Sequence, residues 1–99
     1  MWARVSTFAG SPAELDESIR RATDEVLPGV RGIAGYAGVL TMVDRASGGS
    51  VVVTLWKDEE SLRASEEAAH GLREQAASIV GDVIVSVDRY EVSNIELVS

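Results

Sequence analysis

The chain has 99 residues, of which 45% are hydrophobic and 25% charged, a composition that predicts one water-soluble domain and excludes disordered, collagen-like and membrane-spanning classes. Sixteen Asp and Glu against nine Lys and Arg give a net charge of -7, which repels phosphate backbones and anionic lipids, so neither nucleic acid nor a membrane is an expected partner. Cysteine is absent, which excludes disulfides and thiolate chemistry and fits a cytoplasmic location.

The first third of the chain predicts a strand followed by a helix. Short β-branched and aromatic residues from Trp2 to Ala9 favour the strand, and Gly10 ends it. The next residues, Ser11-Pro12-Ala13-Glu14, match a capping box with proline at the first helical position. We expect the helix to end at Pro28-Gly29. Its apolar stripe recurs at helical spacing and consists of Leu15, Ile19, Ala22 and Val26.

Glycine then occupies every third position from Gly29 to Gly38. A phosphate-binding loop would need a strand before it, a helix after it and further fingerprint residues, which this segment lacks. We therefore interpret the segment as an irregular connection in which glycine permits tight turns and close backbone contacts.

The rest of the chain predicts a hairpin, a helix and a last strand. The residues from Tyr36 to Asp44 and from Ser50 to Trp56 favour strands, joined by a glycine-bearing turn. Asp58 is the expected N-cap of the second helix and Gly81 its C-terminal residue. The apolar face of this helix consists of Leu62, Ala69, Leu72, Ala76 and Val80, and a fourth strand is expected over 82–92.

The order strand, helix, strand, strand, helix, strand is that of the α+β, ferredoxin-like βαββαβ fold, in which two helices cover one face of a four-stranded antiparallel sheet. Residues 1–92 form this domain. Residues 93–99 form a C-terminal tail that is apolar enough to add a short strand.

Apolar residues lie on both predicted faces of the sheet, although two helices can cover only one of them. A bare apolar face would exceed the patch usual for a monomer, so we expect a homodimer in which the two sheets pack face to face. The tail is expected to pair with the edge of the partner's sheet.

The polar residues show no convergent catalytic set, so the sequence leaves open whether the protein is an enzyme. His70 is the only histidine, and we interpret it as a surface imidazole among carboxylates, with a place in the pocket wall as the alternative. No metal-ligand spacing and no serine-nucleophile motif occur, and no cofactor is expected. Trp56 and Tyr36 could line a cavity between sheet and helices, or serve as core or interface residues.

The segment from Val51 to Leu62, a strand that ends in Trp56 and leads through an acidic turn into a helix, resembles the antibiotic biosynthesis monooxygenase-like group of dimeric α/β-barrel proteins. Pro28 to Tyr36 is similar to the proline and glycine segment of that group. The resemblance implies a ferredoxin-like protomer, a homodimer whose sheets form a barrel, and a pocket between each sheet and its helices.

The group includes haem-degrading enzymes and cofactor-independent oxygenases of aromatic polyketides. The haem-degrading members use an asparagine in the first strand, where this chain has none, since Asn94 lies in the tail. They also use a tryptophan in the second helix, near the position of Ser65, and a histidine farther along than His70. We therefore expect a dimeric barrel of unassigned activity that binds a small apolar or aromatic molecule. The alternative is a cofactor-independent monooxygenase that acts on an aromatic polyketide-like substrate.

Overall fold

The computed structural model describes residues 1–98, in which four strands form one sheet: β1 (Trp2–Ala9), β2 (Tyr36–Val43), β3 (Ser50–Trp56) and β4 (Val83–Glu91). Neighbouring strands are antiparallel, and their order is β2-β3-β1-β4. The predicted first and third strands are confirmed at both ends, and the other two end within one residue of their predicted bounds. The N-terminal strand β1 is therefore central in the sheet.

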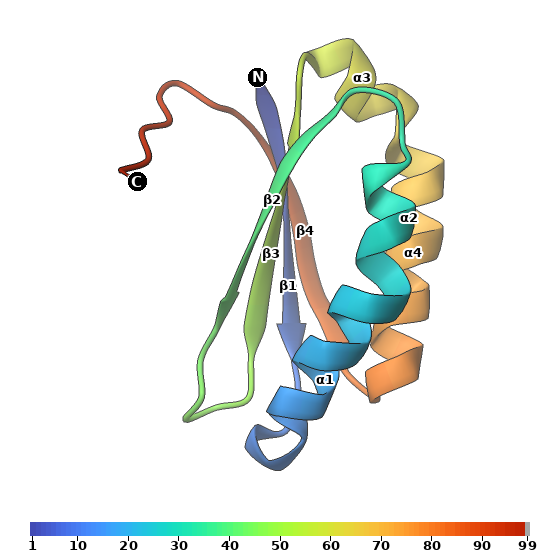
Figure 1. Cartoon of the computed structure of the whole chain (residues 1–99), viewed down its shortest axis with the longest axis vertical. Helices are drawn as coiled ribbons and strands as arrows, with labels where there is room; N and C mark the ends of the chain where they lie inside the picture. The colour runs from blue at the N-terminus through green and yellow to red at the C-terminus, as the bar shows by residue number, and fades with distance from the viewer. Residues whose placement is uncertain (99) are drawn as a thin grey trace.

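The helical segments are the 3₁₀ turn η1 (Pro12–Glu14), α1 (Leu15–Arg21), the π-helical turn η2 (Ala22–Val26), α2 (Leu27–Arg31), α3 (Glu59–Ala64) and α4 (Glu66–Val80). Figure 1 shows α1, α2 and α4 on one side of the sheet, while the opposite side carries no helix. This is the predicted ferredoxin-like arrangement, although each predicted helix consists of more than one segment. Within residues 1–98, no helix is both long and apolar enough to cross a bilayer.

The first helix departs from prediction at both ends. The side chain of Ser11 makes no capping hydrogen bond, so the expected capping box does not form. The helix also continues through Pro28-Gly29 to Arg31. Just before the proline, the backbone bonding widens to a π turn, in which the amide of Leu27 donates to the carbonyl of Ala22. The wider turn accommodates the proline ring, which would clash with an ordinary α-helix, and Pro28 then lies in the first turn of α2, where its missing N–H breaks no bond.

The glycine-rich segment is less irregular than expected. Gly29 lies within α2, Gly32 caps its C-terminus, and Gly38 lies in β2. Only Gly35 needs a conformation special to glycine, with φ at +84°, and a Cβ atom there would clash with Ser61. Close approach to the start of α3 is the reason for glycine at that position.

The second helix is divided in two at Ser65. Asp58 caps α3 as predicted, since its carboxylate accepts a 2.8 Å hydrogen bond from the amide of Ser61. Gly81 closes α4 in a left-handed conformation with φ at +73°, also as predicted. The division at Ser65 was not predicted, because the apolar residues on either side keep helical spacing.

The core lies between the sheet and the helices, where both predicted apolar stripes face, except that the side chain of Val80 is outside the described part of the structure. On the bare side of the sheet, Leu40 and Met42 are about half exposed. In β4, large apolar side chains are also exposed, namely Val83, Val85 and Tyr90.

Residues 93–98 of the C-terminal tail form no strand within the chain, and Ser99 lies outside the described residues. Figure 1 shows the tail leaving β4 on the side of the sheet that carries no helix. Its apolar side chains are exposed, namely Ile95, Leu97 and Val98. Pairing of this tail with a partner's sheet stays a prediction.

Candidate ligand-binding site

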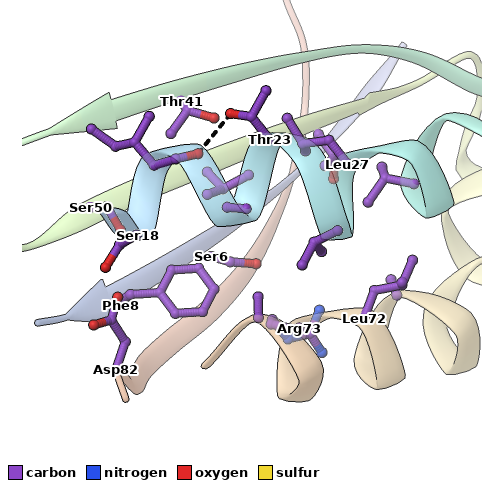
Figure 2. A pocket seen from close by; sticks show the side chains of 18 of the residues that line it. Ser6, Phe8, Ser18, Thr23, Leu27, Thr41, Ser50, Leu72, Arg73 and Asp82 are labelled. Atoms are coloured by element: carbon purple, nitrogen blue, oxygen red, sulfur yellow. Dashed lines mark hydrogen bonds between the residues drawn. The ribbon is translucent and has the colours of Figure 1, made fainter. Parts of the chain in front are cut away.

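A cavity of about 160 Å³ lies between the sheet and the helices. One wall comes from β1, β2 and β3 and the other from α1, η2, α2 and α4, and Figure 2 shows their side chains meeting across it. Most of the lining is aliphatic, with Phe8 and Trp56 as its aromatic members. Because an apolar cavity of roughly 150 Å³ is known to admit benzene, this one has room for a single ring.

Several hydroxyl groups in the lining are already bonded to the protein. Ser18 donates to the carbonyl of Glu14 over 2.9 Å, and Thr23 donates to that of Ile19 over 2.8 Å, as the dashed line in Figure 2 marks. The side chain of Thr54 accepts a 3.1 Å hydrogen bond from Nε1 of Trp56. The lining also holds the hydroxyl groups of Ser6, Thr41 and Ser50.

Two charged side chains lie at separate places in the lining. Arg73 comes from α4, and Asp82 from the turn that precedes β4, beside Phe8 in Figure 2. Burial lowers the pKa of Arg73, and the charges of Arg4 and Arg89 lower it further. Burial raises the pKa of the Asp82 carboxyl. Both charges are thus partly removed from water in the cavity wall.

At the Trp56 end of the cavity lies Arg4, a fully buried arginine on the central strand. Its guanidinium carbon is 5.4 Å from the centroid of the Trp56 ring, within the range of a cation–π interaction. Nη2 lies within hydrogen-bond distance of the Leu62 carbonyl, the Ser65 hydroxyl and Oε1 of Glu66. Nε and Nη1 are buried and have no hydrogen-bond partner within residues 1–98.

Glu66 joins Arg4 to the surface. Oε1 of Glu66 accepts from Nη2 of Arg4 and from Nε of Arg89, both over 2.9 Å, and its Oε2 accepts from Nη2 of Arg89 over 2.7 Å. These bonds, above all those from Arg89, lower the pKa of Glu66 to about 2. The Glu66 carboxylate therefore stays charged at neutral pH, with both of its oxygens in use.

The three side chains singled out from the sequence lie in different places. Trp56 is fully buried and lines the cavity. Tyr36 packs edge-on against Trp56, with ring centroids 6.3 Å apart, and stands outside the lining. His70 is 65% exposed on α4, with Nε2 3.9 Å from a carboxylate oxygen of Glu74. His70 therefore does not line the cavity, and the interpretation as a surface imidazole is the one that agrees with the structure.

Arg4 and Arg73 were not identified from the sequence as candidate site residues. A charged residue at an inward position of a strand is the signal that could have identified Arg4, because it alternates with Ser6 and Phe8 on the side of β1 that lines the cavity. Within residues 1–98, no three His, Asp or Glu side chains are placed to hold a metal ion.

No family model matches this chain. The uncharacterized protein Rv2558 of Mycobacterium tuberculosis is 35% identical over 77 residues, which make up 78% of this chain and 33% of Rv2558. The uncharacterized protein Rv2557 of the same organism is 29% identical over 93 residues, or 94% of this chain and 41% of Rv2557. The chain therefore spans between a third and two fifths of the length of these relatives.

Solved structures resemble the chain over nearly its whole length. The monooxygenase ActVA-Orf6 of Streptomyces coelicolor, in complex with nanaomycin D, gives a TM-score of 0.72 at 19% identity and covers 99% of this chain and 92% of its own. SnoaB, a cofactor-independent oxygenase from Streptomyces nogalater, gives a TM-score of 0.65 at 16% identity. The match covers 95% of this chain and 94% of SnoaB. An antibiotic biosynthesis monooxygenase gives a TM-score of 0.65 at 14% identity, and the match covers 95% of this chain and 100% of that protein. The chain thus has the ferredoxin-like fold of antibiotic biosynthesis monooxygenase-like proteins, as the sequence resemblance implied.

Proposed function

We propose that this protein is a homodimeric α/β barrel that binds a small apolar or aromatic molecule between its sheet and its helices. The observation that carries the proposal is the cavity of about 160 Å³ with a largely aliphatic lining. Filling such a space removes apolar surface of both ligand and protein from water, which favours binding. The nanaomycin D complex of ActVA-Orf6 supports the proposal, because that protein shares the fold. The cysteine-free composition supports a cytoplasmic location.

Toluene is a suitable probe of this proposal, since it matches the size and polarity of the cavity. In a titration followed by methyl and amide NMR, toluene is expected to shift signals of cavity residues such as Leu72 and Val26 in a saturable manner. Two neighbouring alanines of α4 provide matched variants, because Ala69 lines the cavity whereas Ala68 is exposed. Ala69→Phe fills the space and is expected to abolish binding, and Ala68→Phe leaves it intact. Saturable binding that survives Ala69→Phe, or no binding by the wild type, contradicts the proposal.

The homodimer is supported by the apolar side of the sheet. Leu40 and Met42 point away from the helices, because the residue between them, Thr41, lines the cavity. The tail leaves on the same bare side and carries exposed apolar residues (Figure 1). A second copy related by a two-fold axis presents the same surface, so each sheet covers the other. Multi-angle light scattering is expected to give twice the 10.5 kDa chain mass at micromolar concentration.

A second candidate function is a cofactor-independent oxygenase, favoured by the shared fold of SnoaB. In such a reaction the substrate's own carbanion would activate oxygen, while the protein stabilises the enolate and excludes water. Oxygen consumption with a panel of hydroxylated anthrones tests this candidate, and Trp56→Phe is the variant to compare. Absence of consumption with every anthrone leaves ligand binding as the function.

A further inference from the structure

An excess of positive charge gathers at one part of the cavity wall, in a protein whose net charge is -7. Arg4 and Arg73 lie in that wall, and Arg89 of β4 lies close to it, because the charges of Arg4 and Arg89 lower the pKa of Arg73. The carboxylate of Glu66 pairs with Arg4 and Arg89, and both of its oxygens are occupied. Arg73 is therefore the cation of this group that forms no ion pair with Glu66, although the charges of Glu66 and Glu74 raise its pKa from a distance.

Arg73 is placed where a ligand can reach it. Its side chain is half-buried in the lining of the cavity, and within residues 1–98 it forms no side-chain hydrogen bond or ion pair. A cation that has lost part of its water and gained no ion-pair partner is costly, and an anion beside it would offset that cost. Arginine also offers two parallel N–H groups, which match a carboxylate.

A second donor lies across the cavity from Arg73. Ser6 is 6% exposed on β1 and lines the same cavity, and Figure 2 shows Ser6 on the sheet side and Arg73 on the helix side. Unlike the hydroxyls of Ser18 and Thr23, the Ser6 hydroxyl donates to no acceptor within residues 1–98. A guanidinium and a hydroxyl thus border a space whose lining is largely aliphatic, with the hydroxyls of Thr41 and Ser50 and the carboxyl of Asp82 elsewhere in the wall.

We propose that the cavity selects a single-ring acid, whose ring lies among the aliphatic side chains and whose carboxylate or phenolate oxygen is held by Arg73 and Ser6. This proposal rests on the proposed function, since it names the chemical class of the ligand for the same cavity. The size of the space sets the limit of one ring, and the unpaired guanidinium sets the charge.

Benzoate and benzamide test the proposal, because they are nearly identical in size and differ in charge. Their affinities are to be measured by NMR titration with wild type, Arg73→Gln and Arg63→Gln, and toluene serves as the uncharged reference. Arg63 is the matched control, since it is an arginine of α3 that is 75% exposed and pairs with Glu59. The wild type is expected to bind benzoate at least about tenfold more tightly than benzamide. Arg73→Gln is expected to remove this preference and retain toluene binding, while Arg63→Gln retains both.

The outcomes separate the two proposals. If toluene and benzamide bind but benzoate has no advantage, or if Arg73→Gln leaves the advantage intact, the selection for acids is overturned and the ligand cavity stands. If none of the three probes binds, both proposals fail. The amide spectrum of each variant shows whether it is folded, and Arg73→Lys, which keeps the charge, is expected to restore part of the preference if Arg73→Gln does not fold.

Discussion

Arg4 and Ser65 are 61 residues apart in the sequence, yet Nη2 of Arg4 lies 2.9 Å from the hydroxyl of Ser65. The contact joins the central strand to the point where the second helix divides into α3 and α4. Ser65 is itself almost fully buried, and its hydroxyl donates to the carbonyl of Leu62 over 2.7 Å. Arg4 therefore adds a second hydrogen bond to the Leu62 carbonyl and to the Ser65 hydroxyl at the helix break.

The pairing of Glu66 with two arginines makes the cost of removing each partner unequal. Glu66→Gln leaves the buried guanidinium of Arg4 without its carboxylate, and we expect a loss of about 2–3 kcal/mol in the free energy of unfolding. Arg4→Met removes the buried charge itself, and Glu66 keeps Arg89, so the expected loss is smaller. Urea unfolding at one fixed protein concentration measures both. Exposed Arg63→Met is the control, with a change below about 0.5 kcal/mol. A greater loss for Arg4→Met than for Glu66→Gln would show that packing against Trp56 dominates.

The same carboxylate predicts how stability depends on pH. The pKa of Glu66 is lowered from 4.5 to about 2, so its folded state binds a proton less tightly than its unfolded state. The contribution of Glu66 to the free energy of unfolding is therefore complete above about pH 4.5 and is lost as the pH falls toward 2. Urea unfolding between these values is expected to show a steeper decline for the wild type than for Glu66→Gln. Parallel declines would mean that other carboxylates account for the acid sensitivity.

Two glycines are expected to respond in opposite ways to alanine. Gly35→Ala places a Cβ against Ser61 at a positive φ, so we expect a loss of about 2 kcal/mol or more in the free energy of unfolding. Gly71 lies within α4 with open space around it, and Gly71→Ala is expected to gain roughly 0.5–1 kcal/mol from helix propensity. Thermal unfolding of the two variants beside the wild type measures both changes. A tolerated Gly35→Ala would show that α3 can shift away from the turn.

The proposed dimer predicts the effect of a charge on the bare side of the sheet. Leu40→Lys places an ammonium group within the proposed two-sheet interface, where burial of an unpaired charge is costly. Light scattering is expected to give a monomer for this variant, and a dimer for Ala68→Lys, in which the lysine lies on the exposed side of α4. The interface lies elsewhere if Leu40→Lys remains a dimer.

The periodic part of the fold could be predicted from the sequence, because strands and helices with one buried face repeat their apolar residues at a fixed spacing. The ends of the first helix could not be predicted in this way. A proline is accommodated there by a π turn, and the widening at Ala22–Val26 leaves no mark in the apolar spacing. The break at Ser65 is contacted by an arginine that precedes it by 61 residues, which no local pattern reveals.

The candidate site was predicted in part. Trp56, proposed for the cavity wall because it ends the third strand directly before the second helix, lies in the lining, whereas Tyr36 stands outside it and His70 lies on the exposed side of α4. Arg4 and Arg73 were missed, since arginine usually lies at the surface and only their position against the same cavity gives them meaning.

The central position of β1 also determines when the domain can fold. Arg4 lies opposite Thr54 on one side and opposite Arg89 on the other, so both neighbours of the first strand are distant from it in the sequence. Such distant pairings require closure of long loops before any contact stabilises them, which slows folding relative to a helical protein of equal length. During synthesis, β1 leaves the ribosome before the other strands of this sheet and keeps one edge unpaired until β4 follows. The sheet can therefore be completed only when nearly the whole domain has been made.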